Sequence, residues 1–176
     1  MKSFALYAVA LFFQGASLPA ADVEEITPPF GLSWVETRAR VANLIEEAHV
    51  RLAQKETVDG GEAWTVEGFD QPGLSAVLFH FGGDTVDEVE LQYGEPTWTL
   101  NQYGRFMEQL KQVLDQKYGR AAVLAHTRGP EKDVSQTVVG YRWAQKNQAL
   151  DLVFYSAERE RLAFRLVSLR YKAAHP

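Results

Sequence analysis

Hydrophobic side chains recur every three to four residues in the stretch from Pro28 to Leu52, a spacing that predicts an amphipathic helix. Its apolar face contains Val41, Leu44, Ile45, Ala48 and Leu52. Ser33 and Thr37 are alternative N-caps, because each precedes this periodic segment and Ser33 is followed three residues later by Glu36, as in a capping box. The stretch therefore predicts the first helix of a small domain.

A second helix is predicted from Thr99 to Tyr118. The same spacing is carried there by Tyr103, Phe106, Leu110 and either Val113 or Leu114. Gly119 follows directly and is a typical C-terminal stop, because glycine adopts the backbone conformations that end a helix.

Runs in which apolar and polar residues alternate predict six strands, Ala63–Phe69, Leu74–Phe81, Thr85–Tyr93, Val138–Ala144, Ala149–Tyr155 and Arg161–Tyr171. A short additional strand at 121–124 stays open within the irregular stretch 119–136. The apolar phase changes near Val167 in the last run, which favours a β-bulge. Short turns such as Gly82-Gly83 predict antiparallel pairing.

A helix followed by three strands thus occurs twice, which predicts an α+β fold with two layers, an antiparallel sheet packed by two helices. The similar endings Val89–Tyr93 and Val167–Tyr171 fit either a tandem αβββ-αβββ duplication or chance likeness between alternating strands. We expect one domain at 30–172, with halves 30–95 and 96–172. An extended, mobile lead at 22–29 precedes it, and a tail at 173–176 follows it.

The first 21 residues have the pattern of a secretory signal peptide. Lys2 is followed by the apolar run Phe4–Phe13 and by small residues from Ala16 to Ala21. The run is about half the ~20 apolar residues that a membrane-spanning helix needs. We therefore predict cleavage between residues 17 and 24 and an exported protein, periplasmic or secreted, of bacterial type.

The net charge and the absence of cysteine disfavour several kinds of partner and exclude cysteine-based chemistry. The chain has 18 Lys and Arg against 23 Asp and Glu, a net charge of −5, which becomes −6 when Lys2 leaves with the signal. This acidity disfavours nucleic acid and anionic membranes as partners. No segment after the signal is apolar enough to span a membrane. The absence of cysteine excludes disulfides, thiolate nucleophiles and cysteine-based metal sites.

Two short motifs carry a family resemblance. "FGLSW" with Thr37-x-x-x-Val41 is similar to the G-L-x-W-G-M-[ST]-x-x-x-V helix start of small exported bacterial proteins of unknown function, and "LDQKYGR" at 114–120 is similar to the L-x-x-K-Y-G that ends their second helix. The element order resembles the β-lactamase-inhibitor-protein and BamE/SmpA-like folds, which implies a binding module. Val35-Glu36 replaces the usual Gly-Met, and the lipoprotein cysteine is absent.

The motifs of common enzymes are missing from the sequence. No His-Glu-x-x-His, Gly-x-Ser-x-Gly or phosphate-binding loop occurs. The four histidines lack a partner at metal-ligand spacing and are interpreted as structural or surface residues: His49, His80, His126 and His175. We therefore expect no catalytic residue, no metal site and no cofactor.

The sequence favours a non-enzymatic binding or envelope-associated module whose partner is another protein or an envelope component. Its candidate contact residues are the polar groups of an open sheet face together with a loop tryptophan: Glu88, Glu90, Arg142, Asp151, Arg165 and Trp98. Trp98, beside Pro96, is either a recognition residue or part of the core. The alternative is a small secreted hydrolase or carbohydrate-active enzyme with a carboxylate pair assembled by the fold.

Overall fold

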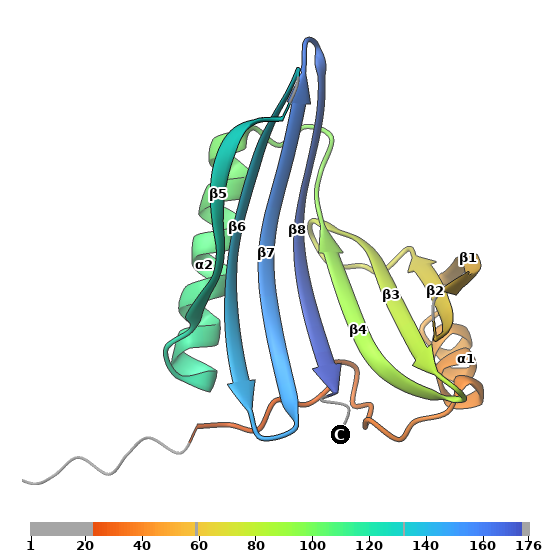
Figure 1. Cartoon of the computed structure of the whole chain (residues 1–176). Helices are drawn as coiled ribbons and strands as arrows, with labels where there is room; N and C mark the ends of the chain where they lie inside the picture. The colour runs from red at the N-terminus through yellow and green to blue at the C-terminus, as the bar shows by residue number, and fades with distance from the viewer. Residues whose placement is uncertain (1–22, 59, 132, 174–176) are drawn as a thin grey trace, which may run out of the picture.

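A single antiparallel sheet of eight strands dominates the computed structural model, which describes residues 23–173 except 59 and 132 (Figure 1). Strands take up 53% of the described residues and helices 20%. The prediction of a two-layer α+β fold with a tandem αβββ-αβββ order is therefore wrong. The fold is β-rich, and each helix precedes four strands. The predicted signal peptide at 1–21 lies outside the described residues, and of the predicted tail only residue 173 is described.

The chain builds the sheet in two halves that meet in its middle. The first half contains α1 (Arg38–Glu47), β1 (Arg51–Val58), β2 (Gly61–Glu67), β3 (Leu74–Gly82) and β4 (Thr85–Tyr93). The second contains α2 (Leu100–Tyr118), β5 (Ala122–Glu131), β6 (Val134–Gln145), β7 (Gln148–Arg159) and β8 (Leu162–Ala173). The strand order is β1-β2-β3-β4-β8-β7-β6-β5, so the last strands of the two halves pair with each other.

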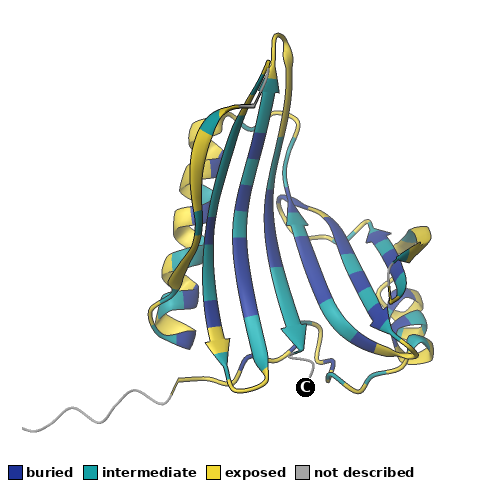
Figure 2. Ribbon diagram, in the orientation of Figure 1, coloured by how far each residue is buried: buried dark blue, intermediate teal, exposed yellow. Residues whose placement is uncertain are grey.

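The two strands at the sheet edges are the ones that alternation predicted poorly. β1 was missed, and β5 was left open as a short strand at 121–124 within a stretch interpreted as irregular. Figure 2 shows both edges mostly exposed, whereas buried positions concentrate in the inner strands. An edge strand is paired on one side only and buries few side chains, so its sequence lacks the apolar alternation from which strands are recognised.

Helix α1 is shorter than its periodicity suggested. Thr37 is the N-cap, and its Oγ1 accepts a hydrogen bond from the Arg40 N–H at 3.4 Å. Val41 and Ile45 are buried as predicted. The helix ends at Glu47 because the chain turns at His49, whose φ is +55°, and Leu52 belongs to β1 instead.

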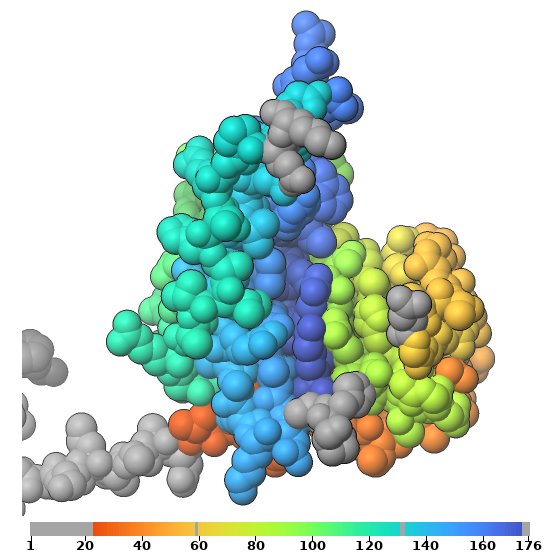
Figure 3. All heavy atoms as spheres, viewed as in Figure 1, coloured from red at the N-terminus to blue at the C-terminus, as the bar shows by residue number. Residues whose placement is uncertain are grey.

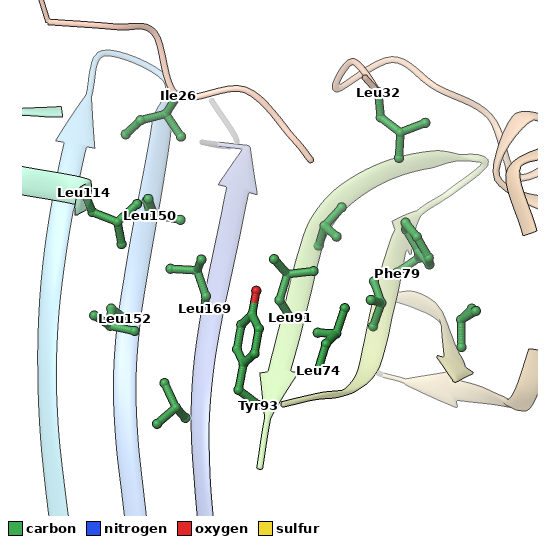
Figure 4. Close-up of a cluster of buried hydrophobic side chains, with 14 of the residues drawn as sticks. Ile26, Leu32, Leu74, Phe79, Leu91, Tyr93, Leu114, Leu150, Leu152 and Leu169 are labelled. Atoms are coloured by element: carbon green, nitrogen blue, oxygen red, sulfur yellow. The ribbon is translucent and has the colours of Figure 1, made fainter. Parts of the chain in front are cut away.

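Both helices cover the same face of the sheet, and the face toward the viewer in Figure 1 is left uncovered. The core lies between this covered face and the helices. Figure 4 shows Leu114 of α2 beside Leu150 of β7. Among the described residues, neither helix combines the length and apolar character needed to cross a membrane.

The lead before α1 packs against the domain, in contrast to the expected mobile arm. Ile26 is fully buried, and its N–H donates to Oε1 of Gln145 at 2.8 Å. The Glu24 N–H donates to the carbonyl of Lys117 at 3.1 Å. The lead therefore joins the end of α2 to the end of β6.

The predicted bulge in the last strand is also wrong. β7 and β8 pair without any register shift from Gln148 opposite Ala173 to Arg159 opposite Leu162. The apolar phase changes because the start of β8 extends past the core. Leu162 and Phe164 are exposed there, on the face opposite to buried Val167 and Leu169.

The second half has longer strands than the first, which leaves part of β8 paired on one side. Pairing between β4 and β8 ends at Tyr93 opposite Val167. Residues 162–166 of β8 continue beyond this point and, in the described part of the chain, pair only with β7. In Figure 1 the β7–β8 hairpin accordingly rises above the end of β4.

A capping box starts α2 and supports a first stability prediction. Oγ1 of Thr99 accepts from the Gln102 N–H at 3.4 Å, and Oε1 of Gln102 accepts from the Thr99 N–H at 2.8 Å. Thr99→Ala removes one half of this exchange and should lower the free energy of unfolding by about 1 kcal/mol. The exposed Thr97→Ala is the matched control. Urea midpoints that are equal for the two variants would show that the cap contributes nothing.

Candidate functional site

Four charged residues of alternating sign cross the middle of the uncovered face. Glu90 of β4 lies opposite Arg170 of β8, Arg170 opposite Asp151 of β7, and Asp151 opposite Arg142 of β6. Residues directly opposite one another in an antiparallel sheet point to the same face. The fold thus joins three of the predicted residues, together with Arg170, into one set that we call the charged row.

The two carboxylates of the charged row are buried, although no helix covers this face. Asp151 is 3% exposed and receives hydrogen bonds from Nε and Nη2 of Arg142 at 2.6 and 2.7 Å. These bonds raise the pKa of the Arg142 guanidinium above its ordinary value, although burial acts in the opposite direction. Glu90 is 6% exposed, and its Oε1 accepts from Oγ of Ser168 at 2.6 Å. The row is therefore compensated internally.

Glu88 lies two residues before Glu90 on the same face of β4 and forms a second polar set with His80 and Lys172. It faces His80 of β3 on one side and Lys172 of β8 on the other. Nζ of Lys172 lies 3.3 Å from Oε2 of Glu88 and 3.7 Å from Oδ2 of Asp151, so it links the two sets. A cavity of about 540 Å³ opens beside His80, Glu88 and Lys172.

Arg165 does not lie with the other predicted polar residues. Because β8 is regular, Arg165 is on the opposite face from Ser168 and Arg170. Its guanidinium pairs with Glu158 of β7, and its Nε is buried without a hydrogen-bond partner among the described residues. A buried donor without an acceptor is costly, so this nitrogen is a candidate contact for a ligand.

Arg165 and Trp98 line the same cavity of about 410 Å³, which we call the notch. It lies between the end of β4 and the unpaired edge of β8 at 162–166, and it also contacts Pro96, Tyr103 and Phe164. In Figure 3 the step from the tall second half to the shorter first half lies at this end of β4. The notch is thus open at a strand edge.

Trp98 is partly buried at the rim of the core. Its ring packs against Tyr103 at 5.2 Å and Phe106 at 5.1 Å between centroids. A methyl group on Gly73 would lie 2.7 Å from its Cη2, so the ring also rests on that glycine. Trp98 therefore packs on the core and also lines the notch, and its role in recognition stays a prediction.

Sequence reasoning missed Phe164, His80, Arg170 and Lys172 as members of these sites. Phe164 is 57% exposed, and its ring lies tilted against Tyr155 on the uncovered face, with 5.9 Å between the ring centroids. No local motif could identify the other three, because strand register alone places them beside Glu88 and Glu90.

The hydrolase alternative required a carboxylate pair in an aromatic-lined pocket. Glu88 and Glu90 do converge, but Lys172 is bound to the first and Arg170 lies 3.6 Å from the second. Phe81 is the single aromatic among the described residues that line the adjoining cavity. The pair therefore has no aromatic platform on which a sugar could stack.

Comparison of this chain with models of protein families, with curated proteins and with solved structures found no match.

Proposed function

We propose that this protein is an exported, non-enzymatic binding module that receives an extended segment of a partner protein in the notch. The observation that carries the proposal is the edge of β8 at 162–166, which pairs with β7 and, among the described residues, has no strand on its other side. Exposed strand edges present unpaired N–H and C=O groups that a further strand can bind. The segment would lie along this edge of β8 in the notch, next to the β4–α2 connection that begins at Gly94.

The side chains around the notch provide contacts for such a segment. An added strand directs alternate side chains to opposite faces of the sheet. On the uncovered face they meet Phe164, and on the helix face they meet Trp98 and Arg165. The buried Nε of Arg165 can donate to a carbonyl or carboxylate oxygen of the partner. Aromatic and arginine anchors of this kind carry most of the affinity of protein interfaces.

The export predicted from residues 1–21 and the resemblance of two short motifs to exported binding modules agree with this proposal. The acidic net charge of −5 favours a protein or envelope component over nucleic acid.

Phe164→Ala is expected to weaken binding of the partner at least tenfold, which corresponds to ~1.4 kcal/mol. Phe164 is exposed at the notch, so its loss should leave the urea midpoint nearly unchanged. The partner would be captured from the envelope fraction with the immobilised protein and then purified for titration. Val35→Ala, 76% exposed before α1, is the control and should bind as the wild type does.

Hydrogen exchange tests the location of the contact independently. Amides at 162–166 should become protected when the purified partner binds. Trp98→Ala should weaken binding as well, with a stability loss of ~1–2 kcal/mol. Unchanged affinity in both variants, with no added protection at 162–166, would show that the notch is not the binding site.

A further inference from the structure

His80, Glu88 and Glu90 bring three metal-ligating groups together on the uncovered face. One donor atom from each side chain lies within 4.8 Å of the other two. His80 of β3 is opposite Glu88 of β4, and Glu90 follows two residues along the same strand. All three side chains therefore project from one face of two hydrogen-bonded strands.

Each of the three residues retains a donor atom for a ligand. The contacts of Glu90 with Ser168, Gln92 and Arg170 all use Oε1, so its Oε2 takes no part in them. The ion pair of Glu88 with Lys172 uses Oε2 and leaves Oε1 outside that pair. Nε2 of His80 is buried and has no hydrogen-bond partner in the described part of the chain. An orphaned imidazole nitrogen beside two carboxylates indicates a ligand rather than a closed polar network.

Lys172 already places a positive charge at this cluster. Its ammonium group lies between Glu88 and Asp151, at 3.3 and 3.7 Å, and its side chain is 30% exposed. If another cation bound Glu88, Lys172 could remain paired with Asp151, which is almost fully buried. The charged row would thus keep its compensation when the cluster takes up an ion.

The adjoining cavity gives room for further ligands. It measures about 540 Å³ and is lined by His80 and Glu88 together with Gly60, which precedes β2, and Gly61, the first residue of β2. Metal sites with three protein ligands complete their coordination with water or with a bound molecule. A cavity at this position provides that space.

We propose that His80, Glu88 and Glu90 bind a divalent metal ion of the zinc class, with solvent in the remaining coordination position. One imidazole and two carboxylates suit zinc and its neighbours. Calcium is a poorer fit because it requires six to eight oxygen ligands. This site is separate from the notch and does not depend on the proposed partner.

Titration with zinc chloride, monitored by calorimetry on purified protein freed of metal by a chelator, tests the proposal. Wild-type protein should bind one ion at this site and show a higher melting temperature with zinc. His80→Gln should weaken this binding at least tenfold. His126→Gln, which changes an exposed histidine on β5, is the matched control and should leave the affinity unchanged.

Two further variants keep the test decisive if His80→Gln folds poorly. Glu88→Gln changes a partly exposed ligand and should also weaken binding at least tenfold. Lys172→Met removes the competing ammonium group and should strengthen binding. The proposal is overturned if the wild type binds no zinc, or if folded His80→Gln and Glu88→Gln bind zinc as tightly as the wild type.

Discussion

Replacing Ile45 by aspartate is expected to destabilise the domain by about 4 kcal/mol or more. Ile45 is 7% exposed and belongs to the core beneath α1. Truncating a buried isoleucine to alanine alone costs ~2–5 kcal/mol, and aspartate adds a charge that the site cannot pair. In urea denaturation, this variant should therefore unfold at a much lower urea concentration than the wild type, or be unfolded without urea.

Glu47→Ala is the control on the same helix. The Glu47 side chain is 67% exposed, and its ion pair with Arg40 measures 3.4 Å. Exposed ion pairs contribute ~0–1 kcal/mol, so the midpoint should barely move. Equal urea midpoints for Ile45→Asp and Glu47→Ala would show that α1 packs on the sheet with a different face.

Arg142→Met is expected to cost ~3 kcal/mol, the second large effect. It removes the two hydrogen bonds that Arg142 donates to Asp151, which is 3% exposed; the ion pair that then remains to Asp151 among the described residues is with Lys172 at 3.7 Å. Breaking a buried ion pair from one side costs ~3–5 kcal/mol because a buried charge is left behind. The lower end applies here, since the Arg142 side chain is 42% exposed.

Arg159→Met provides the matched comparison at the hairpin end of the sheet. Arg159 pairs with Asp133, and both side chains are about 60% exposed. Removing this pair should change the free energy of unfolding by less than ~1 kcal/mol.

Adding Asp151→Asn to Arg142→Met should cost less than the sum of the two single changes, because the variants share one interaction. Full additivity in urea melts would exclude coupling between Arg142 and Asp151.

Inner strands such as β4 could be predicted because one side of the strand is apolar and buried while the other is mostly polar. β4 was predicted with the observed bounds, Thr85–Tyr93, since its buried valine, leucine and tyrosine alternate with polar residues. Helix α2 was predicted within one residue because its apolar side chains keep a helical spacing and Gly119 marks its C-terminal end. β1 and β5 failed for the opposite reason, since edge strands with exposed side chains carry no such contrast.

The faces on which the candidate site residues lie were also predicted correctly where a strand alternates regularly and wrongly where its phase was misjudged. Alternation was sufficient to assign Glu88 and Glu90 to one face of β4, and Asp151 and Arg142 to the uncovered face of their strands. Arg165 was assigned to that face too, because a bulge was expected where the strand is regular. A one-residue error in phase moves every following side chain to the other face.

The sequence by itself determined which residues could be buried and which could carry chemistry. Cysteine absence, acidic charge and periodicity depend on residue types and on neighbours along the chain, so they can be read locally. Tertiary structure alone decided that β4 pairs with β8, that His80 meets Glu88 and Glu90, and that residues 162–166 have no second partner strand within 23–173 as described. These contacts join residues far apart in the chain, and their register is set by the packing of the whole sheet, which no local pattern encodes.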